Sequence, residues 1–77
     1  PFNPSTTIGI TIPVASELEV RVFNTLGREV ASLANGLAMA GEHRIIFDAT
    51  GLASGVYFVH VQVPGKLDKR MKLVYLQ

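Results

Sequence analysis

The sequence contains no cysteine and no tryptophan, and its 77 residues include only four phenylalanines and two tyrosines. Without cysteine the chain has no disulfide, no thiolate nucleophile and no cysteine-type zinc site. Seven lysines and arginines are balanced by six aspartates and glutamates, so the molecule lacks the strong positive field that attracts nucleic acid. No apolar run approaches the roughly 20 residues of a transmembrane helix. We therefore predict neither a nucleic-acid partner nor a transmembrane segment.

Residues able to support catalysis are also few and dispersed. His43 and His60 are the only histidines, and their separation does not match the spacing of a metal site. The closest carboxylates, Glu17 and Glu19, would share one solvated strand face, whereas an acid–base pair needs two different environments. The seven glycines are scattered singly rather than gathered into a phosphate-binding loop. The sequence therefore predicts a protein that is not an enzyme and holds no metal and no cofactor.

The length of the chain limits it to one domain. A domain this small buries roughly 60% of its unfolded surface, which leaves little stability for a strained active site. A hydrophobic content of 48% is nevertheless typical of a folded domain rather than a disordered chain. The sequence starts at Pro1 with neither an initiator methionine nor a signal peptide. We interpret residues 1–77 as a single domain that is a fragment of a longer protein.

Apolar and polar residues alternate with a period of two along most of the chain, a pattern typical of β-strands that are wet on one face. Asn24-Thr25-Leu26-Gly27 and Pro64-Gly65 have the composition of tight turns. Six strands between such turns predict a small antiparallel β-sandwich or barrel. The expected strands cover residues 7–12, 17–22, about 29–34, 42–48, 56–63 and 69–76.

Two of these segments depart from simple alternation of apolar and polar residues. Between Arg28 and Ala40 the apolar residues have the spacing of an amphipathic helix, but Asn35-Gly36 interrupts it. We therefore expect a short strand from about Glu29 to Ala34 followed by a loop. Residues 56–63 are mostly apolar or aromatic, which predicts a central strand that is covered on both faces.

Strand alternation also predicts which side chains form the core. In the last strand it points Met71, Leu73 and Tyr75 inward and Arg70, Lys72 and Val74 outward. The core is expected to include Ile10, Val20, Val22, Phe47, Val61 and Leu73.

Five segments of the sequence carry a resemblance to a known family. In order along the chain they are PFNPSTTI (1–8), VFNTLGREV (22–30), AGEH (40–43), FDATGLASGVYF (47–58) and KRMKL (69–73). Together they closely resemble the C-terminal sorting domain of the type IX secretion system (Por secretion system), type A. The motif residues that we place at structural turns are Asn24, Gly27, Asp48, Gly51, Ser54, Gly55 and Tyr57.

The resemblance implies an all-β fold, a small immunoglobulin-like antiparallel β-sandwich of six to seven strands. It implies a domain at the C-terminus of a secreted protein of Bacteroidota or related phyla, which directs an attached N-terminal cargo from the periplasm through the outer-membrane translocon. A sortase-like protease would then remove the domain, and the cargo would be attached to the cell surface or released. The expected partners are the translocon components, the protease and the cargo.

Two other functions remain open from the sequence. The chain could be an immunoglobulin-like accessory or stalk module, similar to that of the flagellar hook-capping protein, within an extracellular multidomain protein. A carbohydrate-binding module would need a face lined with aromatic rings, which six aromatic residues hardly supply.

A sorting signal needs a surface that another protein can recognise, and an edge strand offers unpaired backbone groups together with side chains. Four of the seven cations, Lys66, Lys69, Arg70 and Lys72, lie close together in the sequence. The last strand joins this cationic cluster to the apolar residues Leu73, Val74 and Leu76. The candidate recognition residues are Lys69, Arg70, Lys72, Val74 and Leu76.

Overall fold

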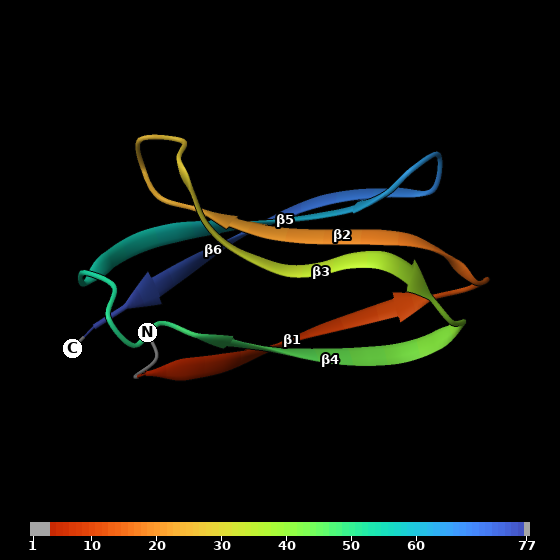
Figure 1. The fold of residues 1–77 in the computed structure, drawn as a ribbon, viewed down its shortest axis with the longest axis horizontal. Coiled ribbons are helices and arrows are strands. Elements are labelled where there is room, and N and C mark those ends of the chain that lie inside the picture. The colour runs from red at the N-terminus through yellow and green to blue at the C-terminus, as the bar shows by residue number, and fades with distance from the viewer. Residues whose placement is uncertain (1–3, 77) are drawn as a thin grey trace.

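The computed structural model describes residues 4–76, which form two antiparallel sheets packed face to face (Figure 1). The described residues include no helix, and therefore none that could cross a membrane. One sheet has the strand order β1-β4 and the other the order β3-β2-β5-β6. The strands are β1 (Ser5–Ile12), β2 (Ser16–Phe23), β3 (Glu29–Ala38), β4 (Gly41–Asp48), β5 (Gly55–Val63) and β6 (Leu67–Tyr75).

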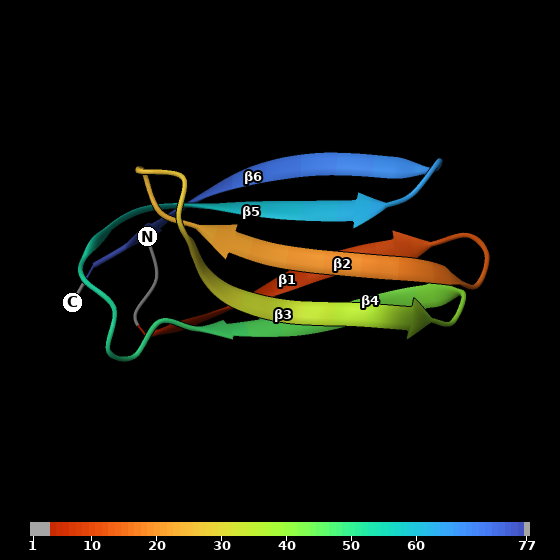
Figure 2. The ribbon, with the colours of Figure 1, turned by 45° about the horizontal axis from the view of Figure 1, so that its top comes forward.

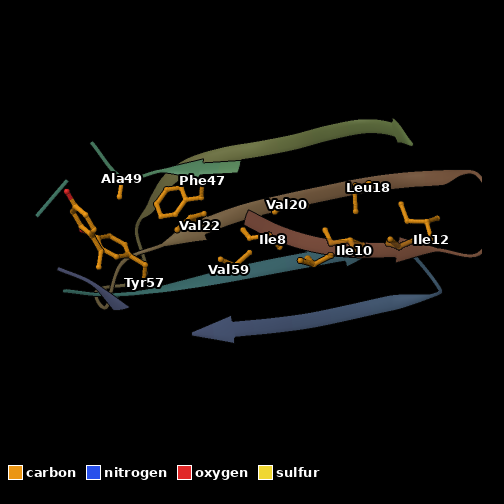
Figure 3. Close-up of a cluster of buried hydrophobic side chains, with 13 residues drawn as sticks. Ile8, Ile10, Ile12, Leu18, Val20, Val22, Phe47, Ala49, Tyr57 and Val59 are labelled. Carbon is orange, nitrogen blue, oxygen red and sulfur yellow. The ribbon is translucent and has the colours of Figure 1, made fainter. Parts of the chain in front are cut away.

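The core lies between the two sheets and is built from the alternate residues of each strand. The three isoleucines of β1 point inward, as do Leu18, Val20 and Val22 of β2. These side chains line up along the length of the sandwich (Figure 3). Burial of apolar area is the main driving force for folding, at about 25 cal/mol per Å². The period-two pattern of the sequence therefore determines which face of each strand packs into the core.

Five of the six predicted core residues are buried, namely Ile10, Val20, Val22, Phe47 and Val61. The prediction for Leu73 is wrong in degree, because this side chain is only partly buried against the core. Leu73 points inward as expected, but it belongs to β6, an edge strand of the larger sheet. The sheet of two strands does not cover the whole inner face of the sheet of four strands.

The predicted end of the third strand is wrong. Asn35-Gly36 does not stop the strand, since β3 continues to Ala38 and Gly36 pairs with Leu18. Gly36 has a φ of 148°, a backbone angle available to glycine and rarely to other residues. The pairing of β2 with β3 also shifts register twice, leaving Leu33 and Val30 as extra residues in β3. Such bulges bend a strand without ending it, and they explain why the alternation of this segment resembled a helix.

The prediction that residues 56–63 are covered on both faces is also wrong. β5 is central in the sense that it pairs with both β2 and β6. Tyr57, Val59, Val61 and Val63 are buried on its inner side. On its outer side, however, Phe58 keeps 40% of its surface exposed. The outer face of the four-stranded sheet is therefore open to solvent and to partners.

Candidate recognition surface

The structure divides the five candidate recognition residues among three locations. Arg70, Lys72 and Val74 lie on the outer face of the four-stranded sheet, because they are in register with the outward residues His60, Phe58 and Val56 of β5. Lys69 is in register with the buried Val61 and therefore belongs to the opposite, inner side of β6. Leu76 follows the end of β6 and is 51% exposed. The candidates thus do not form a single patch.

The outward residues of β6 instead share their face with aromatic side chains of neighbouring strands. Lys72 is in register with Phe58, which is in register with Phe23 of β2. Phe23 and Val74 are partly buried, whereas Phe58 and the two cationic residues are exposed. We call this surface the aromatic–basic face; its residues are Phe23, Phe58, Arg70, Lys72 and Val74.

Several charges elsewhere on the same side of the sheet are paired. Arg21 lies 2.9 Å from a Glu19 carboxylate oxygen and 3.5 Å from one of Glu29. His60 Nε2 donates a hydrogen bond of 2.7 Å to Asp68 Oδ1. Arg70 and Lys72 form no ion pair with any residue between 4 and 76. The aromatic–basic face therefore presents two uncompensated positive charges beside an exposed ring, which suits a partner with acidic and apolar side chains.

Sequence reasoning missed the two phenylalanines of this face. The expectation that residues 56–63 are covered on both faces left Phe58 without an exposed side. Consecutive strand residues point to opposite faces, so the inward position of Tyr57 requires Phe58 to point outward. The register that brings Phe23 beside Phe58 depends on the pairing of β2 with β5, which are far apart in the sequence. No local pattern shows that pairing.

The motif residues Asn24 and Gly27 form the turn between β2 and β3. Asn24 Oδ1 accepts backbone hydrogen bonds from Leu26 (2.9 Å) and Arg28 (3.0 Å), and Gly27 N donates to Asn24 O at 3.0 Å. Gly27 has a φ of 81°, in the left-handed region that a side chain disfavours. Each of these two residues is therefore explained by the geometry of the hairpin.

The connection from β4 to β5 is held in a similar way. Asp48 Oδ1 accepts hydrogen bonds from Thr50 Oγ1 at 2.6 Å and from Thr50 N at 2.9 Å. These two bonds stabilise the ionised form and lower the pKa of Asp48 below its usual value. Gly51 follows with a φ of 89°. Ser54 and Gly55 then bring the chain into the other sheet.

Tyr57 connects this crossing to the core. Its hydroxyl donates a hydrogen bond of 2.6 Å to Ala53 O, four residues upstream. Its ring lies edge-on to Phe47, with the ring centroids 6.3 Å apart. A tyrosine near the start of a strand that bonds back to the preceding corner is a hallmark of immunoglobulin-like sandwiches. The two motif turns and the C-terminal end of β6 lie at the same end of the sandwich (Figure 1).

Replacing Tyr57 by phenylalanine should lower the free energy of unfolding by about 1–2 kcal/mol, because the variant loses the partly buried hydrogen bond from the Tyr57 hydroxyl to Ala53 O. Urea denaturation followed by circular dichroism measures the change. The control is Thr11→Val, which removes an exposed hydroxyl and should change stability by less than about 0.5 kcal/mol. Equal effects of the two substitutions would show that the corner hydrogen bond does not stabilise the domain.

Neither histidine is part of a metal-binding cluster among the described residues. His43 Nε2 donates to Met39 O at 2.6 Å, and His60 contacts Asp68. Within residues 4–76 no group of three or more histidine, aspartate or glutamate side chains converges on a common point. The first three residues of the PFNPSTTI segment, Pro1, Phe2 and Asn3, lie outside the described residues, as does Gln77.

Comparison with models of protein families gives a match over most of the chain. The family model described as the secretion system C-terminal sorting domain matches residues 2–75 of the chain. No curated protein and no solved structure matches the chain significantly.

Proposed function

Because this chain belongs to the secretion system C-terminal sorting domain family and is a type IX sorting signal, we propose that the secretion machinery recognises it through the aromatic–basic face. The domain acts without catalysis of its own. It directs an attached cargo from the periplasm through the outer-membrane translocon. A sortase-like protease then cleaves it from the cargo, which is attached to the cell surface or released.

The observation that supports this face is the position of Arg70 and Lys72 beside Phe58. The three side chains are exposed on one sheet face, and the two cations have no acidic partner among the described residues. Binding hot spots are enriched in aromatic and arginine side chains. β6 is also an edge strand of its sheet, so its outward side chains lie at the border of the sheet, where a partner can approach them.

The sorting role can be tested with a reporter protein fused between a signal peptide and residues 1–77. In a bacterium with a type IX system, the reporter should reach the surface or the medium. In the same strain without the translocon, it should remain in the periplasm. If the reporter stays in the periplasm of both strains while the domain is folded, the accessory-module interpretation replaces the sorting role.

The same fusion tests the cleavage step separately. A surface or released reporter that has lost the mass of the domain supports removal by the sortase-like protease. A reporter that reaches the surface at its full mass would contradict cleavage and leave the export role intact. Mass spectrometry of the exported reporter distinguishes these two results.

A further inference from the structure

We propose that the free edge of β1 and the inner side of β6 form an acceptor site for one extended segment of a partner protein, with alternating apolar side chains and one acidic side chain. We call this site the β1–β6 groove. It is lined by Gly9, Ile10, Thr11, Val61, Leu67, Lys69 and Met71.

Three of the four sheet edges carry features that discourage pairing with another chain. β6 contains Asp68, Lys69, Arg70 and Lys72, and β4 contains Glu42, Arg44 and Asp48. β3 carries two bulges. Charged side chains and bulges are common devices that protect edge strands from pairing with other chains.

The β1 edge has none of these devices. Its eight residues, STTIGITI, include no charge and no proline, and its pairing with β4 has no register shift. Among the described residues β4 is its only partner. Gly9, at the middle of the strand, has no atom within 4 Å of the position that a Cβ would occupy. A straight and uncharged edge is a template for strand addition.

The groove beside this edge has space for side chains of an added strand, whose backbone would lie along β1. Its volume is about 270 Å³, and it lies between β1 on one side and Leu67, Lys69 and Met71 of β6 on the other. Figure 2 shows β1 and β4 behind β2 and β3, with β6 at the far edge of the larger sheet. In immunoglobulin-like sandwiches a first strand flanks the one corresponding to β1. Among residues 4–76 no strand occupies that position.

The width of the uncovered surface determines which kind of partner can bind. The larger sheet extends past β1 by the strand β6. If another folded sandwich paired its edge strand with β1, its second sheet would collide with β6. A single extended segment has no second sheet and avoids this collision. The proposed occupant is therefore an extended segment and not a second copy of this domain.

The charge of the groove defines the chemistry of that segment. Lys69 points to the inner side of β6, and no acidic side chain lies among the residues that line the groove. Lys69 forms no ion pair within residues 4–76. The neighbouring Ile10, Leu67 and Met71 are apolar. An acidic side chain opposite Lys69, between apolar ones, would complement both features.

The test uses the purified domain and a synthetic eight-residue peptide of alternating valine and threonine with one central glutamate, matching the length of β1. Nuclear magnetic resonance should show saturable shifts at β1 and at the inner residues of β6. Alternate amides of β1 should become protected from hydrogen exchange. The absence of saturable shifts up to about 2 mM peptide would overturn the proposal, as would shifts confined to Arg70 and Lys72.

Two controls establish the binding mode. Methylation of one set of alternate peptide amides should abolish binding, and methylation of the other set should not, because only one set of N–H groups faces β1. Equal tolerance of both sets would exclude strand addition.

A charge exchange tests Lys69. Lys69→Glu should weaken binding of the glutamate peptide by about tenfold and favour a peptide with lysine in its place. Arg70→Glu, one residue away on the opposite face of β6, should leave binding unchanged. If both variants weaken binding equally, Lys69 does not face the peptide. Since this assay needs no secretion system, its result is independent of the proposed export role.

Discussion

Replacing Phe47 by alanine is expected to destabilise the domain by about 3–5 kcal/mol. Phe47 is 1% exposed and is among the largest fully buried side chains. Its removal leaves a cavity beside Tyr57 and ends the edge-on contact of the two rings. Small domains have total stabilities of roughly 5–15 kcal/mol. A substantial fraction of the variant should therefore be unfolded at 37 °C, as measured by circular dichroism with urea titration.

The control for this experiment is the adjacent residue. Ile46 lies on the opposite face of β4 and is 66% exposed. Ile46→Ala should change the free energy of unfolding by less than about 0.5 kcal/mol. If the two variants unfold at the same urea concentration, the inner face of β4 does not contribute to the core as the structure shows.

Reversing the charges of Arg70 and Lys72 should reduce export of a reporter fusion by about tenfold or more, because a buried contact with an acidic partner would become a repulsive one. The double variant Arg70→Glu, Lys72→Glu leaves the inward residues Met71, Leu73 and Tyr75 in place. Exposed substitutions away from the core usually change stability by less than about 0.5 kcal/mol each. Fractionation of cells into periplasm, surface and medium measures the effect.

A matched variant separates local recognition from total charge. Arg44→Glu with Lys66→Glu changes the net charge by the same amount, and both residues are exposed outside the aromatic–basic face. This variant should be exported normally. If both double variants are exported like the unchanged domain, another surface is recognised. Circular dichroism of each purified domain verifies that a loss of export is not a loss of fold.

The elements of this fold that could be predicted are those set by local chemistry. Ile8, Ile10 and Ile12 alternate with small polar residues, and that pattern determines both the strand and its inner face. Asn24 and Gly27 are among the residue types that tight turns require. The sequence therefore predicts this hairpin without knowledge of its hydrogen bonds. The same reasoning correctly pointed Arg70 and Lys72 away from the core.

The elements that could not be predicted depend on contacts between distant strands. The burial of Leu73 depends on how far the sheet of β1 and β4 extends over the larger sheet, which alternation does not reveal. Whether Phe58 has a neighbouring ring depends on the register of β2 with β5. Lys69 and Arg70 are adjacent in the sequence and are both candidate recognition residues. On a strand, however, adjacent side chains point to opposite faces, and these two do so. Neighbours in sequence are therefore poor guides to a shared surface on a strand.

The order of strands in the larger sheet also determines how the domain folds. β2 and β3 form a hairpin, as do β5 and β6, so each pair closes only a short loop. The two hairpins join through residues such as Val20 and Val61, about forty positions apart. Closing such long loops costs chain entropy before the contacts form, so all-β domains fold in milliseconds to seconds, slower than helical bundles. Neither hairpin is more than marginally stable alone in water, so until the two join their apolar faces stay exposed to solvent.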